Sequence, residues 1–476
     1  MSNLSLIKQV QWIRFQKSPS FRLGEENFSY LSDAAHNLKG FSYLDASLVH
    51  GNLPSKVQAQ KIADDFLQRY APDLLQHRKI QWVDQHDETI QLNGNNQKIS
   101  GMKVKMRNLN DGRWFWVIVG KNQHPIIFER DIVWINFPGH RKTEKWLHDS
   151  WLKDEPSYIA MGLGCMGMSE FYGQTDDQNS LRILEEAFDS GINFFDTADT
   201  YGHGHNEKLL AQFIAHYRNQ RDAIVIATKF GIVRDQNHYE RRIDNTPNYI
   251  RQACEASLTR LGIEQIDLYY CHRRQTEVPI EDVTGTLSDL IRQGKIKSFG
   301  FSEISAQSLK RANAVAPVTA VQSEYSLWSR EPEQELLQTC SELNVEFVAY
   351  SPLGRAFLTA DLNPATMDAQ DFRKHLPRLQ GDSFQKNQLL LEKFSQICAS
   401  WKHSNAQVAL AWLMGKFTHV TPIFGTRQSR YLQDNLKANQ VMLSDIQIQQ
   451  LDQLFSPEHI QGDRYPQAGW AGIEKF

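Results

Sequence analysis

The chain has 476 residues, 41% of them hydrophobic, and a formal net charge of −3. This length exceeds what one hydrophobic core ordinarily serves, so we expect a soluble globular protein of two domains. The nearly balanced charge argues against nucleic acid or an anionic membrane as the main partner.

The apolar runs and the cysteines indicate a cytoplasmic protein. No apolar run is long enough to span a bilayer, and the first residues, MSNLSLIKQVQWIRFQ, are too polar for a signal peptide. The five cysteines are scattered and lack CxxC spacing. This pattern argues against a disulfide framework or a zinc site and favours a reducing compartment.

Residues 1–150 are expected to form a small α+β domain. Apolar residues recur at helical spacing in residues 55–70, and methionine and valine alternate with basic residues in residues 101–108. Two apolar runs, 114–119 and 126–135, flank a turn-like GKNQHP. The sequence therefore predicts one helix followed by an antiparallel sheet, with a linker at 151–157. The many aromatic residues fit either a two-sided sheet core or an exposed patch for a partner.

From residue 158 onward, short apolar strands alternate with amphipathic helices such as those expected at 180–191, 247–262 and 279–294. Eight strands are expected, at residues 158–163, 192–195, 223–228, 266–271, 296–301, 318–322, 346–350 and 418–423. Eight such units predict a (β/α)₈ TIM barrel over residues 158–476. The same alternation is typical of a doubly wound sheet, so periodicity alone does not decide between the two.

The first strand runs into Gly162-Leu163-Gly164-Cys165-Met166-Gly167, which spells the GxGxxG dinucleotide-binding pattern. That fold requires a helix to open within the glycines, so that its N-terminus meets the pyrophosphate. Here the next helix is expected only near Thr175. We therefore interpret the small residues as a bend that leads the first strand into a loop.

Four polar residues follow predicted strands: Asp196, Tyr201 in the same loop, Lys229 and His272. In a barrel the strand ends meet at one mouth. A lysine beside a tyrosine stabilises the phenolate and lowers the pKa of the phenol from its usual value near 10, and an aspartate keeps that lysine charged. A histidine orients a carbonyl oxygen. Such a site gives a proton to an oxygen that becomes an alcohol, so a nicotinamide cofactor must supply the hydride.

From about Tyr158 to the C-terminus, the chain resembles the aldo-keto reductase superfamily. The matching segments occur in family order: GLGCMGMSEFYG, NFFDTADTYGHGHNE, ATKFG, LYYCHR, GKIKSFGFSE, VQSEYSLWSRE, AYSPLGRAFLT and PIFGTRQSRYLQDN. The resemblance implies the reduction of a small aldehyde or ketone with NADPH. It also implies that Tyr201 is the general acid and that Asp196, Lys229 and His272 complete a catalytic tetrad.

The resemblance also implies a set of cofactor-binding residues. They are Ser302, Gln322, Tyr350, Ser351, Leu353, Arg355, Gly425, Thr426, Arg427, Asp434 and Asn435. In the family's pattern, Ser302 and Gln322 bind the carboxamide of the cofactor, and Tyr350 stacks on its nicotinamide ring. Ser351, Leu353 and Arg355 cover the pyrophosphate. The loop 425–427 binds the 2′-phosphate, and Asp434 and Asn435 lie at the adenine edge.

The chain departs from the family's pattern at two positions that directly follow residues of this set. Glu303 stands where asparagine is frequent, and Gln428 follows Arg427 where a second basic residue is frequent. A guanidinium suits a phosphate, so we expect NADPH in preference to NADH.

Two alternatives concern metal binding and turnover. His203 and His205 lie two residues apart, but no further ligands follow at zinc-like spacing, so we expect no metal site. The alternative function is a cofactor-bound barrel that senses redox state or binds a partner and turns over little. The complete tetrad favours catalysis on a small carbonyl substrate. The substrate's identity, the oligomeric state and the role of residues 1–150 do not follow from the sequence.

Overall fold

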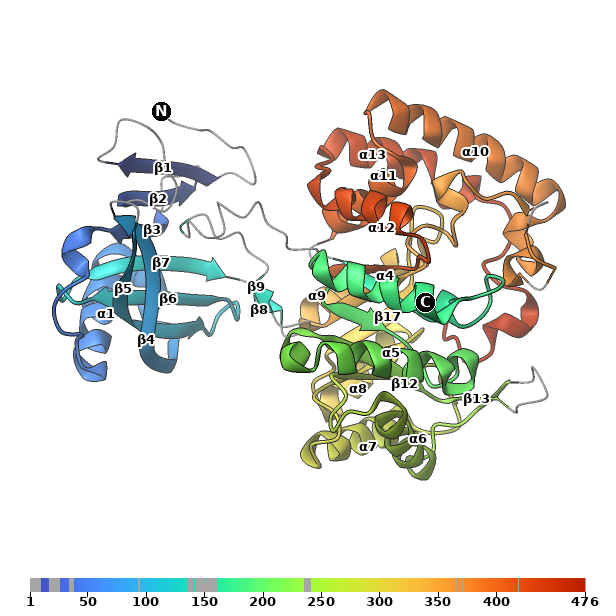
Figure 1. The fold of residues 1–476 in the computed structure, drawn as a ribbon, viewed down its shortest axis with the longest axis horizontal. Helices are drawn as coiled ribbons and strands as arrows, with labels where there is room; N and C mark the ends of the chain where they lie inside the picture. The colour runs from blue at the N-terminus through green and yellow to red at the C-terminus, as the bar shows by residue number, and fades with distance from the viewer. Residues whose placement is uncertain are drawn as a thin grey trace. The chain divides into compact units, whose positions relative to one another are not determined.

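The protein forms two compact units, Met1–Ser157 and Tyr158–Phe476 (Figure 1). The computed structural model describes residues 10–16, 26–33, 38–92, 95–132, 134–135, 140–141, 147, 161–234, 241–364, 367–369, 371–417 and 419–475. The expected linker, 151–157, lies outside the described residues, as does the expected first residue of the second domain. Among the described helices, none has the length and apolar character needed to cross a membrane.

The first unit contains a seven-stranded antiparallel sheet in the order β1-β2-β3-β7-β6-β5-β4. Its strands are β1 (Val10–Gln16), β2 (Asn27–Asp33), β3 (Leu38–Leu44), β4 (Arg78–Leu92), β5 (Asn95–Asn108), β6 (Trp114–Gly120) and β7 (Pro125–Ile132). The small strands β8 (Trp134–Ile135) and β9 (His140–Arg141) pair with each other. The α+β class and the β6–β7 hairpin are confirmed. The expectation that the helix precedes all strands is wrong, because β1 to β3 come first.

Helix α1 (Lys56–Tyr70) packs on one face of this sheet, followed by the short α2 (Pro72–Leu75). Ser55 begins α1 with a capping box, in which its hydroxyl accepts from the backbone N–H of Gln58 while the Gln58 side chain accepts from the N–H of Ser55. The helix buries its alanines and Leu67 in a cluster with alternate residues of β5 and β6. A second cluster, which includes Trp116, occupies the other face. The aromatic residues therefore serve in part a two-sided core.

The second unit is a closed barrel of eight parallel strands. The strands are β10 (Gly162–Gly164), β11 (Phe194–Asp196), β12 (Val225–Phe230), β15 (Leu268–Cys271), β16 (Phe299–Ser302), β17 (Ala320–Glu324), β18 (Glu346–Tyr350) and β19 (Val420–Phe424). Closure between β10 and β19 confirms the barrel over the doubly wound sheet. After β10 the chain enters a short 3₁₀ turn, and the next α-helix begins only at Asp177, so the GxGxxG pattern does not open a helix.

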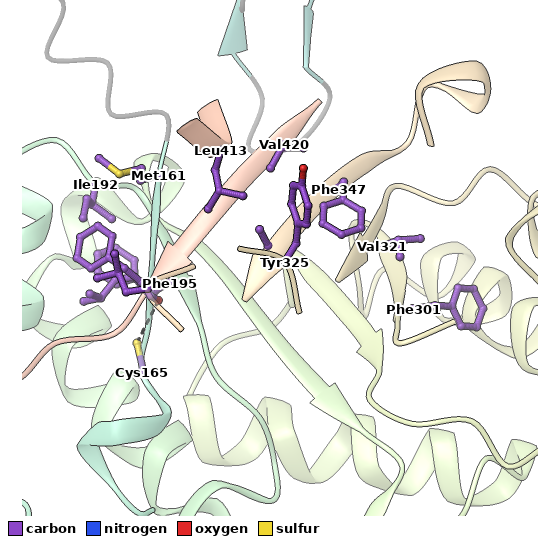
Figure 2. Close-up of a cluster of buried hydrophobic side chains, with 14 of the residues drawn as sticks. Met161, Cys165, Ile192, Phe195, Phe301, Val321, Tyr325, Phe347, Leu413 and Val420 are labelled. Atoms are coloured by element: carbon purple, nitrogen blue, oxygen red, sulfur yellow. Dashed lines mark hydrogen bonds between the residues drawn. The ribbon is translucent and has the colours of Figure 1, made fainter. Parts of the chain in front are cut away.

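Helices surround the barrel strands (Figure 1). They are α4 (Asp177–Asp189), α5 (His205–His216), α6 (Pro247–Leu261), α7 (Ile280–Arg292), α8 (Ala306–Val315), α9 (Leu336–Leu343), α10 (Gly381–Ser400), α11 (Asn405–Lys416), α12 (Ser429–Leu436) and α13 (Asp445–Leu454). Residues at the helix ends fix where a helix begins and stops, as in α6. Thr246 caps its N-terminus, Pro247 is its first residue, and Gly262 ends it in the left-handed conformation. One hydrophobic cluster joins strand residues such as Phe301 and Phe347 to helix residues such as Leu413 (Figure 2).

Short elements complete the barrel's loops. β13 (Ile232–Arg234) and β14 (Arg241–Ile243) form a small antiparallel pair. Over the described residues of both units, the 3₁₀ turns are η1 (Ala46–Leu48), η2 (Met166–Met168), η3 (Tyr201–Gly204), η4 (Arg218–Ala223), η5 (Glu331–Glu333), η6 (Phe357–Thr359), η8 (Phe372–His375), η9 (Pro377–Leu379), η10 (Lys437–Gln440), η11 (Pro457–His459) and η12 (Gln467–Trp470).

Gly300 in β16 is a position where the barrel tolerates no side chain. A Cβ there would collide with the carbonyl oxygen of Ala320 and approach the Tyr270 ring to 2.6 Å. We expect Gly300→Ala to lower the free energy of unfolding by about 1–3 kcal/mol, as overpacking does. The matched control is Gly285→Ala in α7, where a Cβ meets nothing and better helix propensity adds about 0.5–1 kcal/mol. Denaturant titration of both variants checks this; equal stability would contradict it.

Candidate active site

The structure brings the four predicted catalytic residues together. The Lys229 ammonium donates hydrogen bonds to the Tyr201 hydroxyl at 3.3 Å, to the carbonyl oxygen of Thr197 at 2.9 Å and to the Asp196 carboxylate. These three acceptors use all three of its protons. The His272 ring meets the Tyr201 ring edge to face, with 5.8 Å between centroids.

Each of these side chains comes from the end of a barrel strand. Asp196 is the last residue of β11, Lys229 is the last residue but one of β12, and His272 directly follows β15. Tyr201 opens the 3₁₀ turn η3. Gly202 and Gly204 in that turn have positive φ angles of 56° and 84°, a region that suits glycine. The dense polar stretch 196–207 is thus a strand end, a left-handed turn and the start of α5.

The first turn of α5 supports the strand ends. The Asn206 side chain accepts from the Thr197 hydroxyl at 2.6 Å, and the buried Glu207 carboxylate accepts from the Thr228 hydroxyl at 2.6 Å. Both threonines adjoin a residue of the tetrad in the chain. Arg260 pairs with Glu207 and neutralises it. Sequence reasoning missed this support, because polar residues at a helix start look the same whether they cap a helix or hold a neighbouring strand.

Burial dominates the electrostatics of the group. Burial raises the pKa of Tyr201 well above its usual value, and the charge of Asp196 raises it further. Burial also lowers the pKa of Lys229 and raises that of Asp196, while their mutual attraction opposes both changes. The expectation that the pKa of Tyr201 lies below its usual value is therefore wrong, because burial and Asp196 outweigh the lowering effect of the nearby Arg273 charge. The phenol keeps its proton throughout the neutral pH range.

Three of the four tetrad residues open onto one cavity of about 1200 Å³, namely Asp196, Tyr201 and His272, and Lys229 is fully buried behind them. Every residue expected to bind the cofactor also lines this cavity: Ser302, Gln322, Tyr350, Ser351, Leu353, Arg355, Gly425, Thr426, Arg427, Asp434 and Asn435. Further lining residues come from the segment between η6 and η9. The volume exceeds that of a usual pocket for one drug-sized molecule.

Three expected nicotinamide contacts have protein partners of their own. The Gln322 amide donates to the Asp196 carboxylate at 2.8 Å. The Ser302 hydroxyl accepts from a neighbouring guanidinium at 3.3 Å. The Tyr350 hydroxyl donates to the Glu303 carboxylate at 2.7 Å. Each position expected to hold the nicotinamide is thus oriented by a protein group, and Gln322 is bonded directly to the tetrad through Asp196.

The expected phosphate and adenine contacts are likewise oriented by the protein. Arg355 forms an ion pair with Glu324 at 2.7 Å. Arg427 donates to the backbone carbonyl of Tyr172 at 2.7 Å, and burial lowers its pKa. Asp434 accepts from two side chains at the start of α11, at 2.6 and 2.7 Å. These contacts draw the loop after β10 and the loop after β19 to one side of the cavity.

The C-terminal segment beyond α13 adds residues that the sequence did not indicate. Arg464 forms a bidentate ion pair with Glu303, and both side chains are 1% exposed or less. Burial alone would raise the pKa of Glu303, but the charges of Arg464 and Arg273 outweigh it and the pKa is lowered. The Tyr465 hydroxyl lies 3.0 Å from that of Tyr350 and accepts from Arg355 at 2.6 Å. The sequence offered one signal, the departure of Glu303 from the family's pattern.

One of the two histidines of the η3 region, His205, contacts protein side chains. His205 lies 2.8 Å from the Ser169 hydroxyl and 3.0 Å from the Asp177 carboxylate. Over the part of the chain that the structure describes, no cluster of three or more His, Cys, Asp or Glu side chains is arranged to hold a metal ion.

The five cysteines are all free and buried. Burial raises their pKa values, to about 12 for Cys254, Cys271 and Cys398. Because the thiolate is the reactive form, we expect no thiol to react with a disulfide reagent at neutral pH in the native protein. All five should react in denaturant. A native thiol that reacts as fast as the denatured ones would contradict the burial.

Comparison with known proteins identifies the fold's relatives. The sequence pattern of the Aldo/keto reductase family matches residues 160–455. Aldo-keto reductase yakc [NADP(+)] of Schizosaccharomyces pombe is 40% identical over 311 residues, which are 64% of this chain and 91% of that protein. Probable aldo-keto reductase 1 of Glycine max is 38% identical over 317 residues, 66% of this chain and 90% of that protein.

The barrel of this chain is also similar to solved structures of aldo-keto reductases. The glycerol dehydrogenase AKR11B4 of Gluconobacter oxydans matches with a TM-score of 0.57 and 27% identity, over 63% of this chain and 92% of its own. The holo form of aldo-keto reductase AKR11C1 of Bacillus halodurans matches with a TM-score of 0.53 and 25% identity, over 65% of this chain and 94% of its own. The chain therefore belongs to the aldo/keto reductase family, through a barrel that follows a separate α+β unit.

Proposed function

We propose that the protein reduces an aldehyde or ketone to an alcohol with NADPH, and that Tyr201 gives the proton. The observation that carries this proposal is the contact between the Lys229 ammonium and the Tyr201 hydroxyl, 3.3 Å apart, at the wall of a large cavity. The name of the fission yeast relative, which specifies NADP(+), supports the choice of cofactor.

The lining of the cavity fits a dinucleotide phosphate. Its volume of about 1200 Å³ is large, and its wall carries guanidinium groups from Arg355, Arg427 and Arg430 for phosphate oxygens. Ser302 and Gln322 offer polar groups for the carboxamide, and Tyr350 offers an aromatic face for the ring. When bound, NADPH supplies the hydride that the carbonyl carbon accepts.

The tetrad supplies the proton and its electrostatic support. Because burial and Asp196 raise the pKa of Tyr201, the phenol is present in its donating form. When the proton leaves, the charge on the phenolate oxygen develops beside the Lys229 ammonium, which already points at it. The Asp196 carboxylate keeps that ammonium in place, and His272, whose ring meets the Tyr201 ring edge to face, can donate to the carbonyl oxygen.

The test is a reductase assay on the purified full chain, with NADPH or NADH and a panel of small aldehydes and ketones. We expect NADPH to be consumed with at least one carbonyl compound, and NADH to be used less well. NADPH binding without turnover on the whole panel would contradict the proposal. It would favour the second candidate, a cofactor-bound barrel that senses redox state or binds a partner.

A further inference from the structure

The arginines of the cavity wall divide into three kinds. Arg234, Arg355 and Arg373 each pair with a carboxylate, at 2.9, 2.7 and 2.7 Å. Arg427 lies in the loop expected at the 2′-phosphate of the cofactor, and Arg430 lies in α12, which follows that loop. The remaining one, Arg273, directly follows His272 at the tetrad.

Arg273 is buried, with 8% of its surface exposed, and lines the cavity. One nitrogen, Nη1, donates to the carbonyl oxygen of His272 at 2.8 Å and to the Ser302 hydroxyl at 3.3 Å. Among the described residues, no carboxylate lies within ion-pair distance of this guanidinium, and its Nε and Nη2 atoms make no hydrogen bond. Two donor nitrogens of a charged group are therefore available at the cavity wall.

The Glu303 carboxylate does not cancel this charge. Glu303 acts on Arg273 through space, but its carboxylate is already held by Arg464 in a bidentate ion pair. Lys229 and Asp196 likewise neutralise each other. The tetrad region therefore carries one positive charge without an ion-pair partner. A buried cation is costly to leave unpaired, and a guanidinium fits a carboxylate through two parallel hydrogen bonds.

We propose that the substrate is an oxo acid, whose carboxylate binds Arg273 while its carbonyl oxygen lies at Tyr201. This inference rests on the proposed reductase function and narrows its substrate class. His272 and Arg273 are consecutive residues, and both line the cavity. One therefore orients the carbonyl end of a small molecule and the other holds its acidic end. Arg273 is then a specificity-determining residue.

The experiment compares aliphatic aldehydes that carry a terminal carboxylate, in a series of chain lengths, with their methyl esters. Each pair differs in charge and keeps the reacting carbonyl. In the unaltered protein we expect kcat/KM to be about 10- to 100-fold higher for the best acid than for its ester, the effect of a hydrogen bond to a charged group. This comparison needs no variant, so it holds even where a substitution impairs folding.

Variants assign the preference to the residue. Arg273→Met should abolish the preference for the acid while the ester is still reduced, and Arg273→Lys should restore part of it. The dissociation constant for NADPH, measured by fluorescence, should stay the same in both variants.

Three results would overturn the inference. The first is equal use of acid and ester by the unaltered protein. The second is an Arg273→Met variant that loses both substrates equally and binds NADPH more weakly, which would place this arginine on the cofactor. The third is no reduction of acids, esters or the neutral panel, which defeats the proposed function itself and the substrate class with it.

Discussion

Tyr201→Phe is expected to lower kcat by about 100- to 10,000-fold, the contribution of a positioned general acid. The substitution removes one oxygen atom from a ring that is only 8% exposed, and the Lys229–Asp196 pair can remain in place. We therefore expect the dissociation constant for NADPH and the unfolding transition to be nearly unchanged. Steady-state kinetics and cofactor fluorescence on the same preparation check both expectations.

Tyr217→Phe provides a matched control for this result. Tyr217 is also a tyrosine of the barrel unit, but its hydroxyl donates to Asp189 on the exposed side of α4. Its loss should leave kcat unaltered. If Tyr201→Phe retained the activity of Tyr217→Phe, the proton would have to come from another group.

Arg464→Met is expected to lower the free energy of unfolding of the barrel unit by about 3–5 kcal/mol, because it leaves the Glu303 carboxylate buried without its partner. The same carboxylate accepts from Tyr350 and from the backbone N–H of Glu324, so its displacement would also disturb the cavity wall. Chemical denaturation of the barrel unit measures the loss. The double variant with Glu303→Gln should recover much of it, because the buried charge is then gone.

The control for this prediction is Arg311→Met. Arg311 pairs with Glu281 on the exposed surface of neighbouring helices. Water screens such a pair, so its removal should leave the denaturation midpoint close to that of the unaltered protein. Equal midpoints for Arg464→Met and Arg311→Met would show that the buried pair contributes little.

The barrel could be predicted because its signals are local. Short apolar runs such as that before Asp196 mark strands, and capping residues such as Thr246 and Gly262 mark helix ends. The tetrad followed from one geometric rule, that residues after parallel strands gather at one mouth. Lys229 and His272 are far apart in the chain, yet this rule was enough to place them together.

Other features depend on contacts that no local pattern contains. Arg464 meets Glu303 across 161 residues, and either residue alone resembles a surface charge. The direction of the Tyr201 pKa depends on how completely the ring is buried, which spacing does not give. Strands β1 to β3 were missed although β2 alternates serines with aromatic residues such as Phe28 and Tyr30, a strand pattern that the polar residues around it obscured.

The most direct measurement of the central claim uses NADPH that carries deuterium at the transferring C4 position of the nicotinamide. The alcohol formed from a reduced aldehyde should contain one deuterium on the former carbonyl carbon, and Tyr201→Phe should slow its formation to the extent given above. A protein saturated with this cofactor that forms no labelled alcohol from any acid, ester or neutral aldehyde would contradict the account.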